Sequence, residues 1–172
     1  MRKDTYRIAL CGIMAAVSVV LLGVGAMLGI GCYAGPMLAG LCLLPVGRQA
    51  GRKYHALLWL AVSLLSFLLI SDVEQNLMYL CLFGLYPLLR PGFEKLPGLA
   101  RPALKLLFFN AVVIALEALV MLALVPEAMP GWMIALLLVL GNLTFWMYDF
   151  LIPRYDALLW RKLQAFLSRV GR

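Results

Sequence analysis

The chain has 172 residues, of which 65% are hydrophobic and only 13% are charged, and its mean hydropathy is +0.97. A soluble domain is roughly half apolar and about one-quarter charged, so this composition excludes an ordinary soluble fold and predicts one compact membrane domain. The net charge of +7 is not arranged in any nucleic-acid-binding pattern, so we expect the lipid bilayer as a partner and no nucleic acid.

The apolar segments predict an all-α membrane protein, a six-transmembrane-helix bundle. Roughly 20 apolar residues cross the hydrocarbon core of a bilayer. The second and fourth segments are short, and Pro36, Pro45 and Pro87 predict kinks in them. The expected spans are about 7–30, 32–47, 54–71, 73–90, 103–126 and 131–152.

The basic residues predict the orientation of this bundle. All 15 lysines and arginines precede the first span or follow the second, fourth and sixth spans. With six spans they all fall on one side, and the positive-inside rule then places both termini in the cytoplasm. The opposite side carries Asp72, Glu74 and Glu127.

The chain divides into a six-helix transmembrane domain at 1–153 and a basic amphipathic helix at 154–172. Apolar residues of the second segment fall near one helical face, and its basic residues lie largely elsewhere. We therefore expect this tail to lie on the anionic inner leaflet, or else to contact a partner protein.

Small residues mark the first span, namely Ala9, Gly12, Ala15 and Ala16. Small residues four positions apart let another helix approach closely. They pack against helices of this chain or form the docking face for a partner subunit. The glycine-rich turn at 29–36 is either a mobile outer lid or a close-packed helix turn.

Polar side chains descend the fourth span. Ser71 and Glu74 fit a capping box at its start. Asn76, Tyr79 and Tyr86 follow at helical spacing. Tyr79 lies deeper than an aromatic belt residue, so we expect it to face the interior.

The last two spans form a hairpin in which each helix carries two polar residues seven positions apart, on one face. They are Asn110 and Glu117 in the first helix and Asn142 and Asp149 in the second. A tight antiparallel hairpin would bring Glu117 level with Asn142, and Asn110 level with Asp149. Because polar groups are expensive in hydrocarbon, they face protein or a water-filled cavity.

Other chemistry-bearing residues are sparse. The four cysteines show no CxxC spacing and are expected as small core residues, and the single His55 is expected at the interface rather than as a metal ligand. Trp132 is a belt residue or stacks on a bound ring. We expect no catalytic residues, no metal and no cofactor. The cysteines are Cys11, Cys32, Cys42 and Cys81.

The opening RIALCGIMAAVSVVLLGVGAML resembles the first helix of the S components of energy-coupling-factor (ECF) vitamin transporters. The order of elements is similar along the whole chain. This resemblance implies a bacterial cell membrane protein that binds a small-molecule solute, a water-soluble nutrient, in its outer half. It also implies a transmembrane coupling subunit that docks at Gly12 and Ala16, beside Ala9 and Ala15, and two cytoplasmic ATPases.

Three functions follow from these patterns. As a solute-binding subunit, the protein would line its pocket with Asn76, Tyr79, Glu117 and Asn142, and the acidic Glu117 would favour a neutral or cationic solute. As a structural scaffold for other membrane proteins, it would use the polar residues of the hairpin only as interhelical hydrogen bonds. An intramembrane enzyme or proton-coupled carrier ranks last, because the sequence offers no nucleophile–base pair or metal-ligand cluster.

Overall fold

The computed structural model describes residues 2–28, 31–123 and 131–170, without the side chains of 2–4, 31–32, 121–123, 133–134 and 159–170. Every regular element in these ranges is a helix. Four stretches are long and apolar enough to cross a membrane: Thr5–Leu28, Arg52–Leu69, Ala100–Val120 and Ala135–Leu158. The all-helical class is confirmed, and the four long apolar helices are those of a multi-pass membrane protein.

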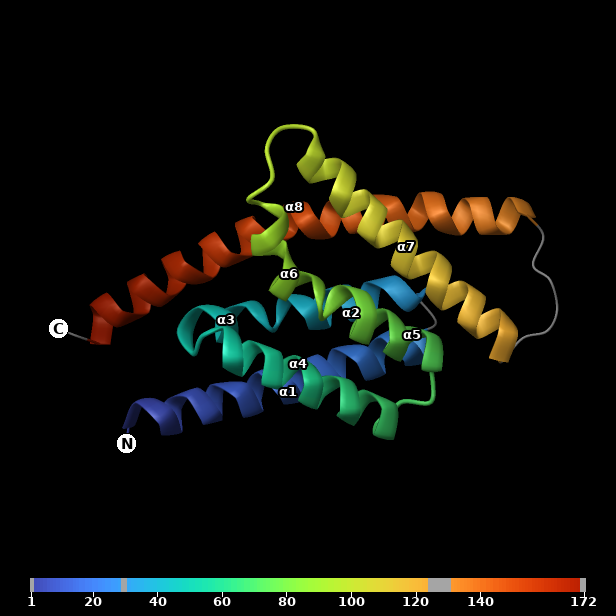
Figure 1. Ribbon diagram of the computed structural model, residues 1–172. Helices are drawn as coiled ribbons and strands as arrows, with labels where there is room; N and C mark the ends of the chain where they lie inside the picture. The colour runs from blue at the N-terminus through green and yellow to red at the C-terminus, as the bar shows by residue number, and fades with distance from the viewer. Residues whose placement is uncertain (1, 29–30, 124–130, 171–172) are drawn as a thin grey trace.

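These four stretches belong to continuous helices that form the outside of the molecule (Figure 1). Large apolar side chains such as Ile13, Leu64, Leu107 and Val139 are exposed on them. A helix that turns apolar residues outward suits a hydrocarbon environment rather than water. The helices are α1 (Arg2–Leu28), α4 (Arg52–Leu69), α7 (Ala100–Ala123) and α8 (Gly131–Val170).

The two segments expected as short spans are interrupted. The second consists of α2 (Gly31–Leu41) and α3 (Leu44–Gln49), and the fourth consists of α5 (Val73–Met78), a π-helix η1 (Tyr79–Phe83) and α6 (Tyr86–Phe93). Pro45 and Pro87 lie in the first turns of α3 and α6. The kinks expected near them are confirmed, whereas α2 continues through Pro36.

The start of α5 corrects one detail. Its N-cap is Asp72, whose side chain accepts a hydrogen bond of 3.0 Å from the backbone N–H of Gln75. The capping box expected at Ser71 is therefore wrong by one residue. Aspartate and serine are about equally good N-caps, so the sequence pattern alone did not choose between neighbouring positions.

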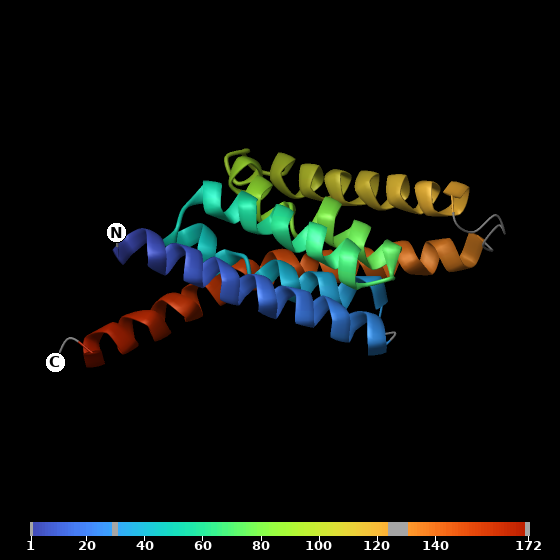
Figure 2. The same ribbon diagram turned by 90° about the horizontal axis from the view of Figure 1, so that it is seen from below.

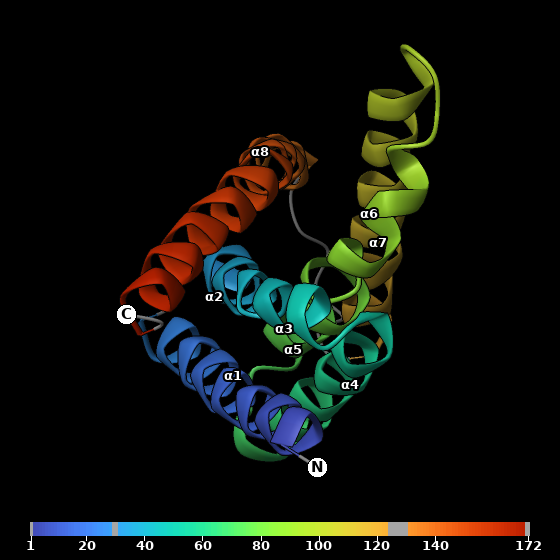
Figure 3. The same ribbon diagram turned by 90° about the vertical axis from the view of Figure 1, so that its left-hand side faces the viewer.

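Most of the two interrupted segments lies at the centre of the bundle, whereas α6 lies beside α7. Figure 3 shows α2, α3 and α5 in the middle, with α1, α4, α7 and α8 around them, and α2 packs against both α5 and η1. Breaks in a helix free backbone groups that lipid cannot satisfy, so such breaks are tolerated where protein surrounds them.

Side chains from the outer helices satisfy these freed groups. The indole N–H of Trp59 in α4 donates to the carbonyl of Leu80 at 3.0 Å, and the hydroxyl of Tyr148 in α8 donates to the carbonyl of Phe83 at 2.6 Å. A Cβ at Gly40 in α2 would overlap both the Phe83 carbonyl and the Tyr148 hydroxyl. The π-helix is thus held from three sides.

The last helix does not stop where expected. α8 runs unbroken from Gly131 to Val170 with Pro153 inside it, so no helix boundary lies at 152, and the division between 1–153 and 154–172 remains a prediction. Proline removes one helical hydrogen bond and favours a bend, and Figures 1 and 2 show α8 changing direction along its length. Most side chains of the amphipathic tail lie outside the described residues.

Candidate functional site

Asn76 and Tyr79 both face the interior, and both are fully buried. The amide nitrogen of Asn76 donates to the carbonyls of Ser66 (3.3 Å) and Ile70 (2.9 Å), which end α4. The side-chain oxygen of Asn76 and the hydroxyl of Tyr79 have no hydrogen-bond partner among the described residues. The interior position expected for Tyr79 is confirmed, and two buried polar atoms there are left without a bond.

Glu117 is half-buried on α7. It lies within electrostatic reach of Glu74 in the first turn of α5, and no hydrogen bond to its carboxyl group occurs in the described part of the chain. The nearby like charge disfavours the ionised form of this carboxyl group.

Asn142 does not lie level with Glu117. Its amide exchanges two hydrogen bonds with Asn110, of 3.0 and 2.9 Å. Each amide nitrogen also donates to the carbonyl four residues earlier, that of Leu106 at 2.9 Å or Leu138 at 2.8 Å. The expected hairpin register is therefore wrong, because Asn110 pairs with Asn142 and not with Asp149.

Asp149 instead joins three helices at the end of the bundle that holds the termini. Its two carboxylate oxygens accept from the hydroxyl of Tyr86 (2.6 Å), from Nε of Arg90 (3.0 Å) and from Nζ of Lys105 (2.8 Å). Lys105 is only 6% exposed. Its ammonium group also binds Glu94 at 2.8 Å.

Glu94 completes this network, which we call the Asp149 cluster: Tyr86, Arg90, Glu94, Arg101, Lys105 and Asp149. The carboxylate of Glu94 forms ion pairs with Arg90 at 3.0 Å and with Arg101 at 3.2 Å. The hydrogen bond from Lys105 and the neighbouring positive charges lower the pKa of Glu94. The cluster is a mutually satisfied ion network that ties α6, α7 and α8 together.

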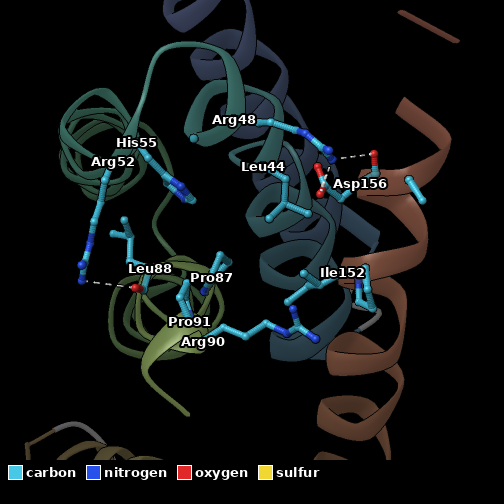
Figure 4. A pocket seen from close by; sticks show the side chains of 13 residues that line it. Leu44, Arg48, Arg52, His55, Pro87, Leu88, Arg90, Pro91, Ile152 and Asp156 are labelled. Carbon is cyan, nitrogen blue, oxygen red and sulfur yellow. Dashed lines mark hydrogen bonds and ion pairs between the residues drawn. The ribbon is translucent and has the colours of Figure 1, made fainter. Parts of the chain in front are cut away.

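Two of the cavities formed by the described residues lie at this same end. The larger, of about 630 Å³, lies between α3, α6, α8 and the start of α4 (Figure 4). The smaller, of about 260 Å³, borders the Asp149 cluster. Neither is lined by Asn76, Tyr79, Glu117 or Asn142, so the expected four-residue pocket remains a prediction.

The small residues of α1 face outward. Ala9, Gly12 and Ala16 are exposed, Ala15 is half-buried, and a Cβ at Gly12 would meet nothing within 4 Å. Packing against helices of this chain therefore does not explain the exposed three.

The close approach of α1 to α2 lies further along, at Gly25 and Gly35. A Cβ on Gly25 would lie 3.0 Å from the Cα of Gly35. Buried Gln75 bridges the same place by donating to the carbonyl of Leu22 at 2.7 Å. This favours a close-packed turn over a lid at Gly35, although residues 29–30 lie outside the described part. Trp132 is 70% exposed, as a belt residue would be.

His55 is the residue that sequence reasoning missed. It was expected at the interface but is only 6% exposed, and its Nε2 atom has no partner in the described chain. Its neighbours in sequence are basic, and basic segments are usually exposed, so the sequence did not indicate that His55 is buried. The described residues contain no group of three histidine, cysteine or acidic side chains that could hold a metal ion.

Comparison with known proteins gives no relative for this chain. No family model, no characterised protein and no solved structure matches it.

Proposed function

We propose that this protein is a six-span membrane protein that binds a small water-soluble nutrient, as the S components of ECF importers do. The observation that carries the proposal is the pair of interrupted helical segments that pack against each other in the middle of the bundle. In transporters, discontinuous helices of this kind form the substrate site, because their breaks expose backbone and side-chain polar groups inside the membrane.

Six crossings follow if each interrupted segment counts as one. Residues from Gly31 to Gln49 and from Val73 to Phe93 span about 28 and 31 Å at about 1.5 Å per helical residue, close to the hydrocarbon thickness of about 30 Å. Together with the four long helices they give six spans. The basic residues then all lie on the cytoplasmic side of the membrane of a bacterial cell.

The solute site would lie around Asn76, Tyr79 and Glu117. The unbonded oxygens of Asn76 and Tyr79 are support, because buried polar atoms without partners are rare in native proteins and call for an explanation. Glu117 with nearby Glu74 would favour a neutral or cationic solute. Asn142 is not part of this proposed site, because its amide group is hydrogen-bonded to that of Asn110.

The outward-facing small residues of α1 support a further part of the proposal. A coupling subunit that carries two ATPases would dock at Ala9, Gly12 and Ala16, which are exposed among the described residues, so that another helix can approach closely. Ala15 would lie at the border of that contact.

The test is the thermal stability of purified protein with a panel of vitamins and cofactor precursors. One compound should raise the midpoint of unfolding, and Glu117→Gln should abolish the shift. Asp156→Asn, which removes an acid at the opposite end, is the matched control and should keep it. No shift with any compound, in protein that is folded, would contradict the proposal.

A structural scaffold is the second candidate. It is favoured by the complete mutual bonding of Asn110 with Asn142 and of the Asp149 cluster, which needs no solute. In that case Gly12→Leu should remove a co-purifying membrane protein and leave every ligand-induced thermal shift unchanged.

A further inference from the structure

The larger cavity is an open cleft with walls of two kinds. Apolar side chains of α3, α6 and α8 line one part, among them Leu44, Leu88 and Ile152, and basic side chains line the rest. Figure 4 shows His55, Leu44, Arg48, Arg90 and Ile152 around one common space, and Arg52 at its edge, where its side chain runs along Leu88. Such a surface suits a ligand that is itself partly apolar and partly anionic.

The cleft carries an excess of positive charge. Three arginines and one aspartate line it. Arg48 forms an ion pair with Asp156, and Arg90 uses Nε and Nη2 for Asp149 and Glu94. Arg52 contacts the carbonyl of Leu88 at 3.5 Å and no carboxylate in the described chain, so its charge is not neutralised there.

A buried donor points into the same space. The imidazole of His55 projects from α4 into the cleft (Figure 4). Its Nδ1 side lies tightly against Gly47 of α3, where a Cβ would overlap the ring. Its Nε2 atom is itself buried and has no hydrogen-bond partner among the described residues, and a buried ring nitrogen without a partner calls for one.

The start of α4 adds a positive dipole end to this arrangement. Gly51, the N-cap, offers no side chain to the first N–H groups of this 18-residue helix. A helix N-terminus with free N–H groups attracts anions, above all phosphate. The uncompensated charge of Arg52 and the buried donor of His55 lie in the first turn of the same helix.

We infer that this cleft binds the phosphate of an anionic phospholipid. Arg52 and the imidazole of His55 would hold the phosphate, and Leu44, Leu88 and Ile152 would contact the glycerol and first acyl carbons. Basic pockets between membrane helices bind acidic lipid headgroups in this way. A free phosphate would use the basic part alone, and the apolar wall would have no role. If the proposed orientation holds, this lipid belongs to the inner leaflet. Lipid binding itself does not depend on the proposed solute.

The first measurement is a binding titration in neutral detergent, read by native mass spectrometry and thermal shift. Short-chain phosphatidylglycerol, phosphatidylcholine with the same chains, and inorganic phosphate are the three probes. Phosphatidylglycerol should bind at least about tenfold more tightly than phosphatidylcholine, because both lipids carry the phosphate but the choline ammonium group cancels the net charge and is repelled by Arg52. Equal binding of the two lipids would overturn the inference, and so would inorganic phosphate that binds as tightly as phosphatidylglycerol.

Neighbouring residues of α4 supply matched variants. Arg52→Gln should weaken phosphatidylglycerol binding about tenfold, Arg52→Lys should keep most of it, and Lys53→Gln should leave it unchanged because Lys53 does not line the cleft. Both glutamine variants remove one exposed charge, so neither threatens folding. Equal losses of phosphatidylglycerol affinity in Arg52→Gln and Lys53→Gln would show that binding depends only on general surface charge, and would refute the site.

Discussion

Two acids on neighbouring helices have opposite surroundings. Asp149 of α8 accepts hydrogen bonds from Tyr86, Arg90 and Lys105, whereas Glu117 of α7 has a second acid, Glu74, within electrostatic reach. An ionised group inside a membrane protein is stabilised by the partners that its structure supplies. Asp149 is therefore held as part of the framework, whereas the described residues offer the carboxyl group of Glu117 no hydrogen-bond partner.

The largest expected effect comes from Asp149→Ala. This change leaves the buried ammonium group of Lys105 with Glu94 alone, and breaking a buried ion pair costs about 3–5 kcal/mol. We expect a loss of about 3 kcal/mol in the free energy of unfolding, measured by titration with denaturing detergent. Glu117→Gln, the matched control on α7, should change it by less than about 0.5 kcal/mol. Similar losses in both variants would remove the distinction between the two acids.

The next effect concerns Tyr148, beside Asp149 on α8. Tyr148→Phe leaves the Phe83 carbonyl of the π-helix buried without its donor, which costs about 1–3 kcal/mol. Tyr155→Phe is the control on the same helix, because no hydrogen bond of the Tyr155 hydroxyl is found in the described residues. A larger loss for Tyr155→Phe would contradict the role given to Tyr148. The free energies of unfolding of the two variants are measured from their unfolding curves and compared.

Halfway between the two acids, Asn110 and Asn142 test the strength of neutral polar pairing. Interhelical hydrogen bonds in membranes average about 0.6 kcal/mol, so the coupling energy between Asn110→Leu and Asn142→Leu should be of order 1 kcal/mol for two bonds. A double-mutant cycle on unfolding free energies measures this coupling. No coupling would show that the reciprocal pair does not form.

The smallest effect is a pH dependence of the Asp149 cluster. Because Lys105 and the neighbouring arginines lower the pKa of folded Glu94, its contribution is present at pH values above the ordinary glutamate pKa. It is lost as the pH falls below that value and through the pKa of the folded state. The unfolding midpoint should therefore fall with acidification, and less steeply in Glu94→Gln. Identical slopes of unfolding midpoint against pH in the two proteins would exclude Glu94 as a source of the pH dependence.

Apolar segments and prolines predicted part of this fold, since apolar runs mark the long helices and two prolines mark breaks, although α2 continues through Pro36 and α8 through Pro153. The breaks near Pro45 and Pro87 and the buried Tyr79 were predictable in this way. The hairpin register was not, because a seven-residue spacing on both helices allows more than one pairing. Asn110 pairs with Asn142 because Asp149 is bound instead by Lys105 of α7 and Arg90 of α6. The burial of His55 was likewise not predictable, because it depends on Gly47 of α3 packing against its ring.

The unbroken course of α8 has a mechanical consequence. Forty residues make a helix of about 60 Å, twice the roughly 30 Å of a hydrocarbon layer, so α8 is too long to lie wholly within the membrane. Asp156, past Pro153 on this rod, is tied to Arg48 of α3. Any rocking of the membrane part would therefore swing the end of α8 beyond Pro153 through an arc.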